Sequence, residues 1–295
     1  MNQMEFQRRF GTERQCREHL FRKRRPKGFS CPRCGHGEHF DVQSRRLCQC
    51  KRCGHQASVT AGTTMDKTRT PLAKWFLAIF LMAGDKRGIS ALALKGRVGV
   101  AYQTAWSMCH RIRRAMGSRD AGQRMGGAVE MDEAFFGSPT EGGKRGRGSE
   151  KTPVLVSVSR TGAGKPGRAR MKVVEKVTSE AVTEFSEAAV AKGSEVRTDG
   201  LHVYRRLAKI GYSLNQRKVG PKDESGHLRW AHVVISNAKA FIGGTFHGLD
   251  ARHLQRYLDE FCYRFNRRWD LRGVFSRLVD ACASAGRITY AELIG

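Results

Sequence analysis

Acidic residues are scarce in this sequence, yet three of them stand within four consecutive positions. The chain has 295 residues with 27 Asp and Glu against 54 Lys and Arg, and Glu130, Asp132 and Glu133 all lie in the segment 129–137. This segment alternates apolar and acidic residues and stops at a glycine, which predicts a half-buried β-strand with Glu130 and Asp132 on one face. Because carboxylates are preferred ligands of Mg²⁺ and Mn²⁺, we expect Asp132 to bind a catalytic metal ion.

A second aspartate ends another short predicted strand. Asp199 stands at the end of the segment 195–200 and is followed by Gly200, at the kind of strand end where active sites of α/β sheets gather. A simple Asp-Gly turn is the alternative. The predicted elements before it are strands at 129–137, 154–158 and 170–174 and a helix at 178–191. This order is the topology of a ribonuclease H-like sheet, whose first and fourth strands are neighbours, so Asp132 and Asp199 could share one metal ion.

Four cysteines are spaced for a different metal. They form two CxxC pairs, Cys31 with Cys34 and Cys50 with Cys53, and a glycine follows each pair. Four thiolates suit tetrahedral Zn²⁺, and each tight turn directs two sulfurs at one ion. We therefore expect a structural zinc ribbon over residues 28–62. Cys48 is an alternative member of the set, although Cys50 gives the better-spaced turn.

The charge balance of the whole chain indicates a polyanionic partner. The net charge is +27 and the isoelectric point is near 10.4, while 40% of residues are hydrophobic and no tract is repetitive. These values favour a folded nucleic-acid-binding protein over a ribosomal or chromatin-like basic protein. The longest apolar run, 75–83, is far below the roughly 20 residues that span a bilayer. No apolar stretch follows Met1 and the cysteines fit a reducing compartment, so we expect a cytoplasmic, nucleoid-associated protein with no membrane partner.

Helical periodicity dominates the remainder of the first half. Residues 1–27 predict one basic N-terminal helix, and residues 63–118 predict a helical region. Within that region, a helix near 90–94, a glycine-bearing turn at 96–100 and a basic helix at 103–116 are typical of a helix-turn-helix. The residues expected to contact DNA there are Arg111, Arg113 and Arg114. Ordinary packing of a small helical bundle is the alternative.

The second half predicts an α/β core over residues 127–270, after a polar boundary at 118–127. A glycine- and cation-rich loop at 139–151 is placed to close over a phosphate backbone. The remaining elements are a strand at 216–219, helices at 230–241 and 254–268, and a C-terminal tail at 271–295. Arg264, Arg267 and Arg268 in the last helix are expected to bind DNA. The fold class is therefore α+β or α/β, with a zinc ribbon and a helix-turn-helix-like region ahead of a ribonuclease H-like core.

The order of these motifs resembles one family. The residues that carry the resemblance are the two CxxC pairs and residues 104–106, 129–133, 198–200, 244–247 and 257–268. Together, over roughly residues 5 to 270, they resemble bacterial insertion-sequence transposases that combine an N-terminal zinc ribbon with a DDE-type catalytic core. The segment 257–268 is the most specific of these motifs.

The resemblance implies roles for particular residues. Asp132 matches the first catalytic acid and Asp199 the second, while Lys239 resembles a lysine that contacts the terminal phosphate. Many relatives place a glutamate seven residues before this lysine, where the present chain has His232. Other relatives use an asparagine, and Asn237 stands two residues before the same lysine, so both alternatives stay open. Glu130, on the same face as Asp132, could supply the missing negative charge to the metal site.

The resemblance also implies a reaction and its partners. Two Mg²⁺ or Mn²⁺ ions would promote cleavage and strand transfer of double-stranded DNA, at the ends of the mobile element and at a target site, without a covalent protein–DNA intermediate. A homo-oligomer is expected in the DNA complex. One alternative is a DNA-binding protein whose transposase core has lapsed or been repurposed, since the third position is uncharged. The other is a zinc-ribbon transcription factor.

Overall fold

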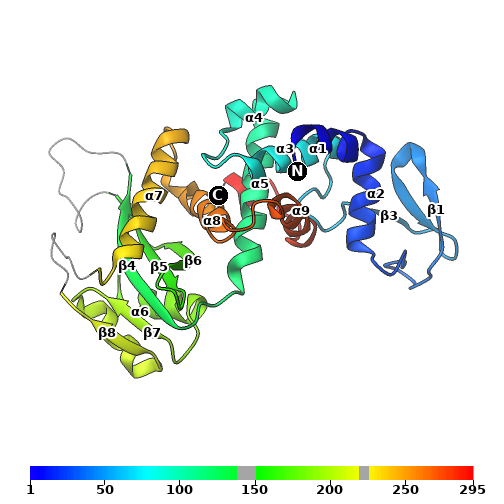
Figure 1. The fold of residues 1–295 in the computed structure, drawn as a ribbon. Helices are drawn as coiled ribbons and strands as arrows, with labels where there is room; N and C mark the ends of the chain where they lie inside the picture. Colours follow the sequence, from blue (N-terminus) through cyan, green and yellow to red (C-terminus); the bar gives the residue numbers. More distant parts are fainter. Residues whose placement is uncertain (138–150, 219–225, 295) are drawn as a thin grey trace. The chain divides into compact units, whose positions relative to one another are not determined.

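This computed structural model describes residues 1–137, 151–218 and 226–294 (Figure 1). The chain divides into two compact units. The first unit contains residues 1–118 and 270–295, and the second contains residues 119–269. Apart from Lys151, the loop expected at 139–151 lies outside the described residues. Among the helices that are described, none has the length and apolarity needed to span a bilayer.

The N-terminal region forms two helices where the sequence analysis expected one. α1 covers Gln3–Phe10 and α2 covers Glu13–Arg24. Thr12 separates them with a capping box: its side chain accepts a hydrogen bond from the backbone N–H of Gln15, and the Gln15 side chain accepts one from the N–H of Thr12. The prediction of one continuous helix was wrong because this local start signal was overlooked.

A small antiparallel sheet follows and forms the expected ribbon. Its strands are β1 (His39–Val42), β2 (Leu47–Cys50) and β3 (Gln56–Ser58), in the order β1-β2-β3, and a short 3-10 helix, η1 (Gln43–Arg45), joins the first two. Phe29 and Ala57 form a small core with the buried cysteines. So small a core needs a further source of stability.

The rest of the first unit is helical, as was predicted for residues 63–118 but not for residues 271–295. Its helices are α3 (Leu72–Gly84), α4 (Ala91–Val98), α5 (Tyr102–Ala121, which ends in the second unit), α9 (Val274–Ser284) and α10 (Ala291–Ile294). The turn predicted at 96–100 was placed too early, because α4 continues to Val98 and ends at Gly99, which has a left-handed conformation.

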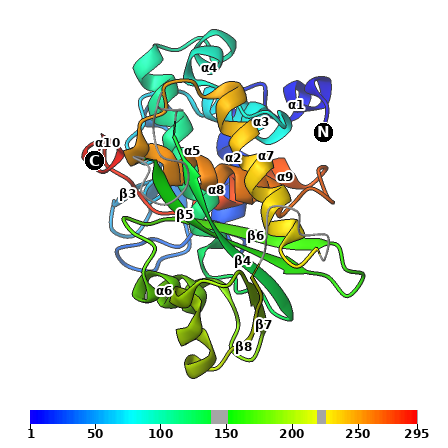
Figure 2. The same ribbon diagram turned by 90° about the vertical axis from the view of Figure 1, so that its left-hand side faces the viewer.

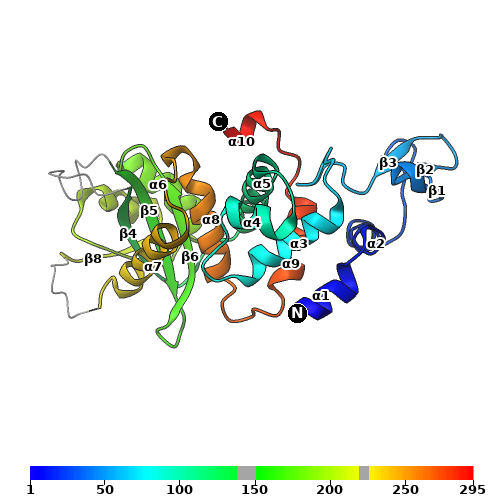
Figure 3. The ribbon, with the colours of Figure 1, turned by 90° about the horizontal axis from the view of Figure 1, so that it is seen from above.

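Residues 271–295, which were expected only as a tail, contribute to the core of the first unit. Figure 3 shows α9 beside α3, and the ring of Phe275 lies 5.3–6.4 Å from those of Phe6, Phe10, Phe76 and Phe80. Through these aromatic contacts, α9 packs against α1 and α3. The first unit is therefore built from both ends of the chain.

A five-stranded sheet organises the second unit. Its strands are β4 (Ala128–Phe136), β5 (Thr152–Arg160), β6 (Pro166–Val173), β7 (Glu195–Thr198) and β8 (Ser213–Gln216), in the order β6-β5-β4-β7-β8. β4, β5 and β6 are antiparallel, whereas β7 pairs in parallel with β4 and with β8. The predicted pairing of the first and fourth strands is thus present. The fifth strand ends at Gln216, earlier than predicted, and Val219 lies outside the described residues.

Helices pack against both faces of this sheet (Figures 1 and 2). α6 (Ser179–Ala189) and the 3-10 helix η2 (His202–Ile210) cover the face that carries Val129 and Met131. α7 (Arg229–Thr245) and α8 (Leu254–Phe265) cover the opposite face, which carries Ala134 and Phe136. A short 3-10 helix, η3 (Ala251–His253), precedes α8. The alternation of side chains along β4 therefore assigns its residues to two separate cores.

The arginines expected to bind DNA at the end of α8 hold this unit together instead. The guanidinium of Arg267 donates two hydrogen bonds to Asp120, at 2.6 and 3.0 Å. Arg268 donates to backbone carbonyls of β6, and Arg264 donates to the buried Glu260 at 2.8 Å. The assignment of Arg264 and Arg267 to DNA is corrected, because their side chains are nearly buried and their donors are used within the protein.

Loss of the Arg267–Asp120 pair should destabilise the protein. Arg267→Ala removes both hydrogen bonds from this guanidinium to the largely buried Asp120, which keeps the Asn266 amide at 3.2 Å and Arg168 at 3.7 Å, so we expect a loss of about 2 kcal/mol in the free energy of unfolding. A drop of several degrees in Tm measured by thermal unfolding would show this. Arg206→Ala is the matched control, because the Arg206–Glu180 pair is exposed and should contribute less than about 1 kcal/mol. Equal Tm values for the two variants would contradict the structural role of Arg267.

Candidate active site and zinc site

Two similar turns bring the four predicted zinc ligands together. The N–H of Gly35 donates to the carbonyl of Cys31 at 2.9 Å, and that of Gly54 donates to the carbonyl of Cys50 at 3.0 Å. Both glycines have a positive φ, +73° and +69°, which side chains other than glycine rarely adopt. The glycine after each CxxC pair is therefore required by the turn that presents the two sulfurs.

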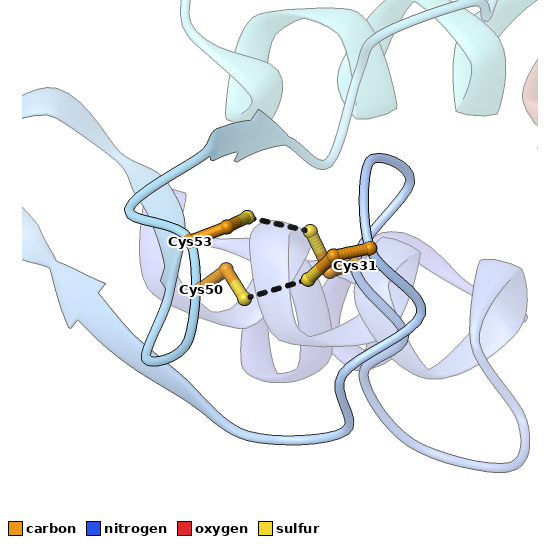
Figure 4. A group of neighbouring side chains, drawn as sticks. Cys31, Cys50 and Cys53 are labelled. Carbon is orange, nitrogen blue, oxygen red and sulfur yellow. Dashed lines mark hydrogen bonds between the residues drawn. The ribbon is translucent and has the colours of Figure 1, made fainter.

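The sulfur atoms have the separation expected around a tetrahedral ion. Cys31 and Cys53 are 3.6 Å apart at sulfur, as are Cys34 and Cys50, and all four sulfurs lie within 4.8 Å of one another. Figure 4 shows Cys50 and Cys53 of one turn facing Cys31 of the other. Zn–S bonds of about 2.3 Å in a tetrahedron place sulfurs about 3.8 Å apart, so this donor set fits Zn²⁺. The prediction of Cys50 is confirmed, because Cys48 is not part of the group.

One zinc ion should be essential for the ribbon. Cys34→Ser should lose bound zinc and unfold β1–β3, because so small a core depends on the metal. Cys48→Ser is the control, since Cys48 is buried beside the site but is not among the four ligands. Metal content by atomic emission and hydrogen exchange of residues 28–62 would measure both effects. Zinc loss in Cys48→Ser with retention in Cys34→Ser would refute the ligand set.

In the second unit, two predicted catalytic residues meet across β4 and α7. The Nε2 atom of His232 lies 3.3 Å from an Oδ atom of Asp132. Lys239 follows His232 by seven residues, close to two helical turns, and so lies on the same face of α7. Asn237 follows by five residues, which places it about 140° around the helix. Of the two alternatives for the third position, His232 is the one that the structure brings to Asp132.

Asp199 lies one residue beyond β7, on the strand that pairs with β4. The parallel register ends with Glu130 opposite Arg197, two residues before Asp132 on β4 and two before Asp199. An Oδ atom of Asp199 also accepts a hydrogen bond from the N–H of Leu201 at 3.1 Å, which fixes the turn after the strand. The two aspartates therefore follow neighbouring parallel strand segments at the same end of the sheet.

The ligand atoms at this site are less tightly gathered than the cysteines. Within the part of the chain that is described, the four cysteines form the only group of three or more His, Cys, Asp or Glu side chains with ligand atoms within 4.8 Å. Asp132, Asp199 and His232 therefore do not form a closed cage. Mg²⁺ sites commonly have one or two carboxylates completed by water and substrate phosphate. The two aspartates fit that donor set.

Glu130 has a different role from the metal ligation that was expected. Its Oε2 atom accepts hydrogen bonds from the backbone N–H groups of Trp230 at 2.7 Å and Ala231 at 2.9 Å. These are free donors at the start of α7, where a carboxylate is favourable. The other oxygen lies 3.7 Å from Arg160. Because the side chain is fully buried and binds the helix terminus, Glu130 is corrected from a metal ligand to a residue that positions α7.

On the opposite face of β4, Tyr204 of η2 forms a contact with Glu133 that was not predicted from the sequence. Its buried hydroxyl donates a hydrogen bond to Glu133 at 2.9 Å. Burial raises its pKa well above the usual value, and the nearby carboxylates of Glu133, Asp132 and Asp199 raise it further. The Tyr204 hydroxyl therefore lies within reach of the fields of all three acids. No local pattern around position 204 indicates this contact.

The predicted DNA contacts of α5 are only partly accessible. Arg113 is 1% exposed and donates to the carbonyl of Ile89, so its assignment to DNA is corrected. Arg111 points to the carbonyl of Thr64 at 3.4 Å, and Arg114 lies 3.8 Å from Glu292. The basic character of this helix thus serves the packing of the first unit to a large extent.

Two substitutions of Glu130 should distinguish the contribution of its charge to stability from the contribution of its hydrogen-bond acceptor. Glu130→Ala leaves two N–H groups of α7 without their acceptor and should cost about 2 kcal/mol in the free energy of unfolding, whereas Glu130→Gln keeps an acceptor oxygen. Burial raises the pKa of Glu130, so the wild type loses stability as pH rises through that raised value. The Tm of Glu130→Gln should therefore gain on that of the wild type as the pH rises above 4.5, the ordinary pKa value of this carboxyl group. Equal stability of the Ala and Gln variants would refute the capping role.

Comparisons with known proteins match the regions that contain the cysteine cluster and the five-stranded sheet. Residues 124–266 match the ISXO2-like transposase domain family, and residues 11–56 match the transposase zinc-ribbon domain family. A protein described as an uncharacterized protein in transposable element ISH50, from Halobacterium salinarum, is 28% identical over 218 residues, which cover 67% of this chain and 71% of the relative. The two matched domains follow one another in the order in which the structure has the ribbon and the sheet. The chain thus combines a region similar to transposase zinc ribbons with a following region similar to ISXO2-like transposase domains.

Proposed function

We propose that this protein is an active DDE-type transposase, which cleaves double-stranded DNA at the ends of an insertion sequence and joins them to a target. The observation that carries the proposal is the contact of His232 with Asp132, on the strand that pairs with the one ending at Asp199. The sheet order β6-β5-β4-β7-β8 supports a ribonuclease H-like core. The net charge of +27 supports a DNA partner.

The two aspartates are the residues that would hold Mg²⁺ or Mn²⁺. Such ions supply an activated water or 3′-hydroxyl and stabilise the leaving oxygen of an in-line phosphodiester displacement. His232 is the third residue of the site. Its imidazole orients Asp132 through the 3.3 Å contact and offers a nitrogen ligand, which Mn²⁺ accepts more readily than Mg²⁺ does.

Lys239 would bind the phosphate next to the reaction. Its side chain is exposed and lies on the same face of α7 as His232, with Nζ 5.8 Å from the ring centroid of Phe136. An ammonium in this place neutralises a phosphate without reading sequence. The zinc ribbon and the helices of residues 63–118 would bind the inverted repeats. The protein would act as a homo-oligomer on DNA in the cytoplasm, at the nucleoid.

A second candidate is a DNA-binding protein whose catalytic core has lapsed. The observation that favours it is the imidazole at the third position, which brings no negative charge to the metal site. Such a protein would bind element ends with no metal-dependent product. A zinc-ribbon transcription factor would behave in the same way.

Strand transfer with Mn²⁺ and DNA containing the element ends tests the proposal. Asp132→Asn should lower the rate at least a hundredfold, about 2.7 kcal/mol of transition-state stabilisation, with DNA affinity unchanged. His232→Ala should also lower the rate of strand transfer. Asn237→Ala is its matched control, because it is exposed on the same helix but turned away from Asp132.

Three outcomes of this experiment are decisive. No product from the wild-type chain would favour the lapsed core. Full activity of Asp132→Asn would exclude this site. A defect in Asn237→Ala with normal activity of His232→Ala would assign the third position to Asn237.

A further inference from the structure

A cavity lies between the end of β4 and the second half of α7, beside the proposed active site. Its volume is about 410 Å³, within the range of small-ligand sites, and the buried rings of Phe136 and Phe246 form part of its wall. Gly243 of α7 also lines it. An apolar cavity with aromatic walls is suited to a flat ring.

Two lysines are among the residues that line this cavity. Lys151, Lys239 and His247 line it, and no Asp or Glu is among its lining residues within the described parts of the chain. Lys239 places its Nζ over the ring of Phe136, 5.8 Å from the centroid. Aromatic rings next to ammonium groups match a nucleotide, in which an uncharged flat base is joined to a negative phosphate.

The cavity is close enough to the aspartates for one DNA strand to reach both. Phe136 follows Asp132 by four residues on β4, about 13 Å, and Lys239 follows His232 by seven residues on α7, about 10 Å. These lengths correspond to about three or four base steps of a B-form strand. Lys239, which would hold a phosphate, lies at the cavity.

We propose that this cavity binds one unstacked base of the DNA strand, a few nucleotides from the phosphodiester on which Asp132 and Asp199 act. The location beside the scissile phosphate rests on the proposed function, whereas capture of a base does not require catalysis. A base held out of the helix would fix the register of the strand at the active site. It would also favour DNA that is already mismatched or distorted.

Gly243 allows the cavity to be filled without damage to the helix. A Cβ at this position meets no atom within 4 Å, so Gly243→Leu would project into the cavity. Gly244→Leu is the matched control, because a Cβ there also meets nothing but the residue does not line the cavity. Both changes replace a helical glycine by a better helix former. Gly243→Met serves as a second variant should the leucine chain not fold.

The test compares three DNA duplexes by fluorescence anisotropy, with zinc-loaded protein and without Mg²⁺ or Mn²⁺. One duplex is fully paired, one has a single extra nucleotide, and the third has the same bulge without its base. We expect the wild type and Gly244→Leu to bind the base-containing bulge about tenfold more tightly than the other two. Gly243→Leu should lose this preference and retain its affinity for paired DNA.

Other results would overturn the inference. Equal affinity of the wild type for all three duplexes would mean that no base is captured, and equal affinity for both bulges would assign the effect to DNA flexibility. A preference retained in Gly243→Leu would place the base elsewhere. None of these results depends on cleavage, so a failure of the proposed function would appear separately, as absence of product with Mn²⁺.

Discussion

The hydrogen bonds from α7 to Glu130 are the constraint on which the candidate active site depends. A fully buried carboxylate on β4 accepts the N–H groups of Trp230 and Ala231, so the first turn of α7 is held against the strand. Asp132 follows Glu130 on the same face of β4, and His232 follows Ala231 on the helix. The contact of His232 with Asp132 is therefore a direct consequence of this docking. Asp132 is two residues from Glu130 on the strand, and His232 is one residue from Ala231 on the helix.

Polar side chains just after α8 make a second set of contacts within this unit. Arg267 binds Asp120, and the Asn266 side chain pairs with the backbone of Ala169 on β6 at 2.7 and 3.1 Å. Buried charges of this kind contribute little when they are compared with apolar packing, but each is costly to break. They fix the register between α8 and the edge of the sheet.

Features that depend on local periodicity could be predicted from the sequence. The alternation at 129–137 identified β4, and the doubled CxxC spacing identified the four ligands. The order of elements predicted that β4 and β7 would be neighbours. The partners of individual charged residues could not be predicted, because Glu130 binds atoms 100 residues away and Arg267 binds Asp120 across 147 positions. The split between α1 and α2 was predictable, since Thr12 and Gln15 have capping-box spacing.

In the proposed mechanism, Asp132 of β4 and Asp199, which follows β7, bind one divalent cation. Electron paramagnetic resonance of Mn²⁺ bound to the zinc-loaded chain in complex with DNA measures this directly. Asp199→Asn should lose the bound Mn²⁺ signal to the same extent as Asp132→Asn, while Glu130→Gln keeps it. Wild-type Mn²⁺ binding by Asp199→Asn, or its loss in Glu130→Gln alone, would contradict the assignment.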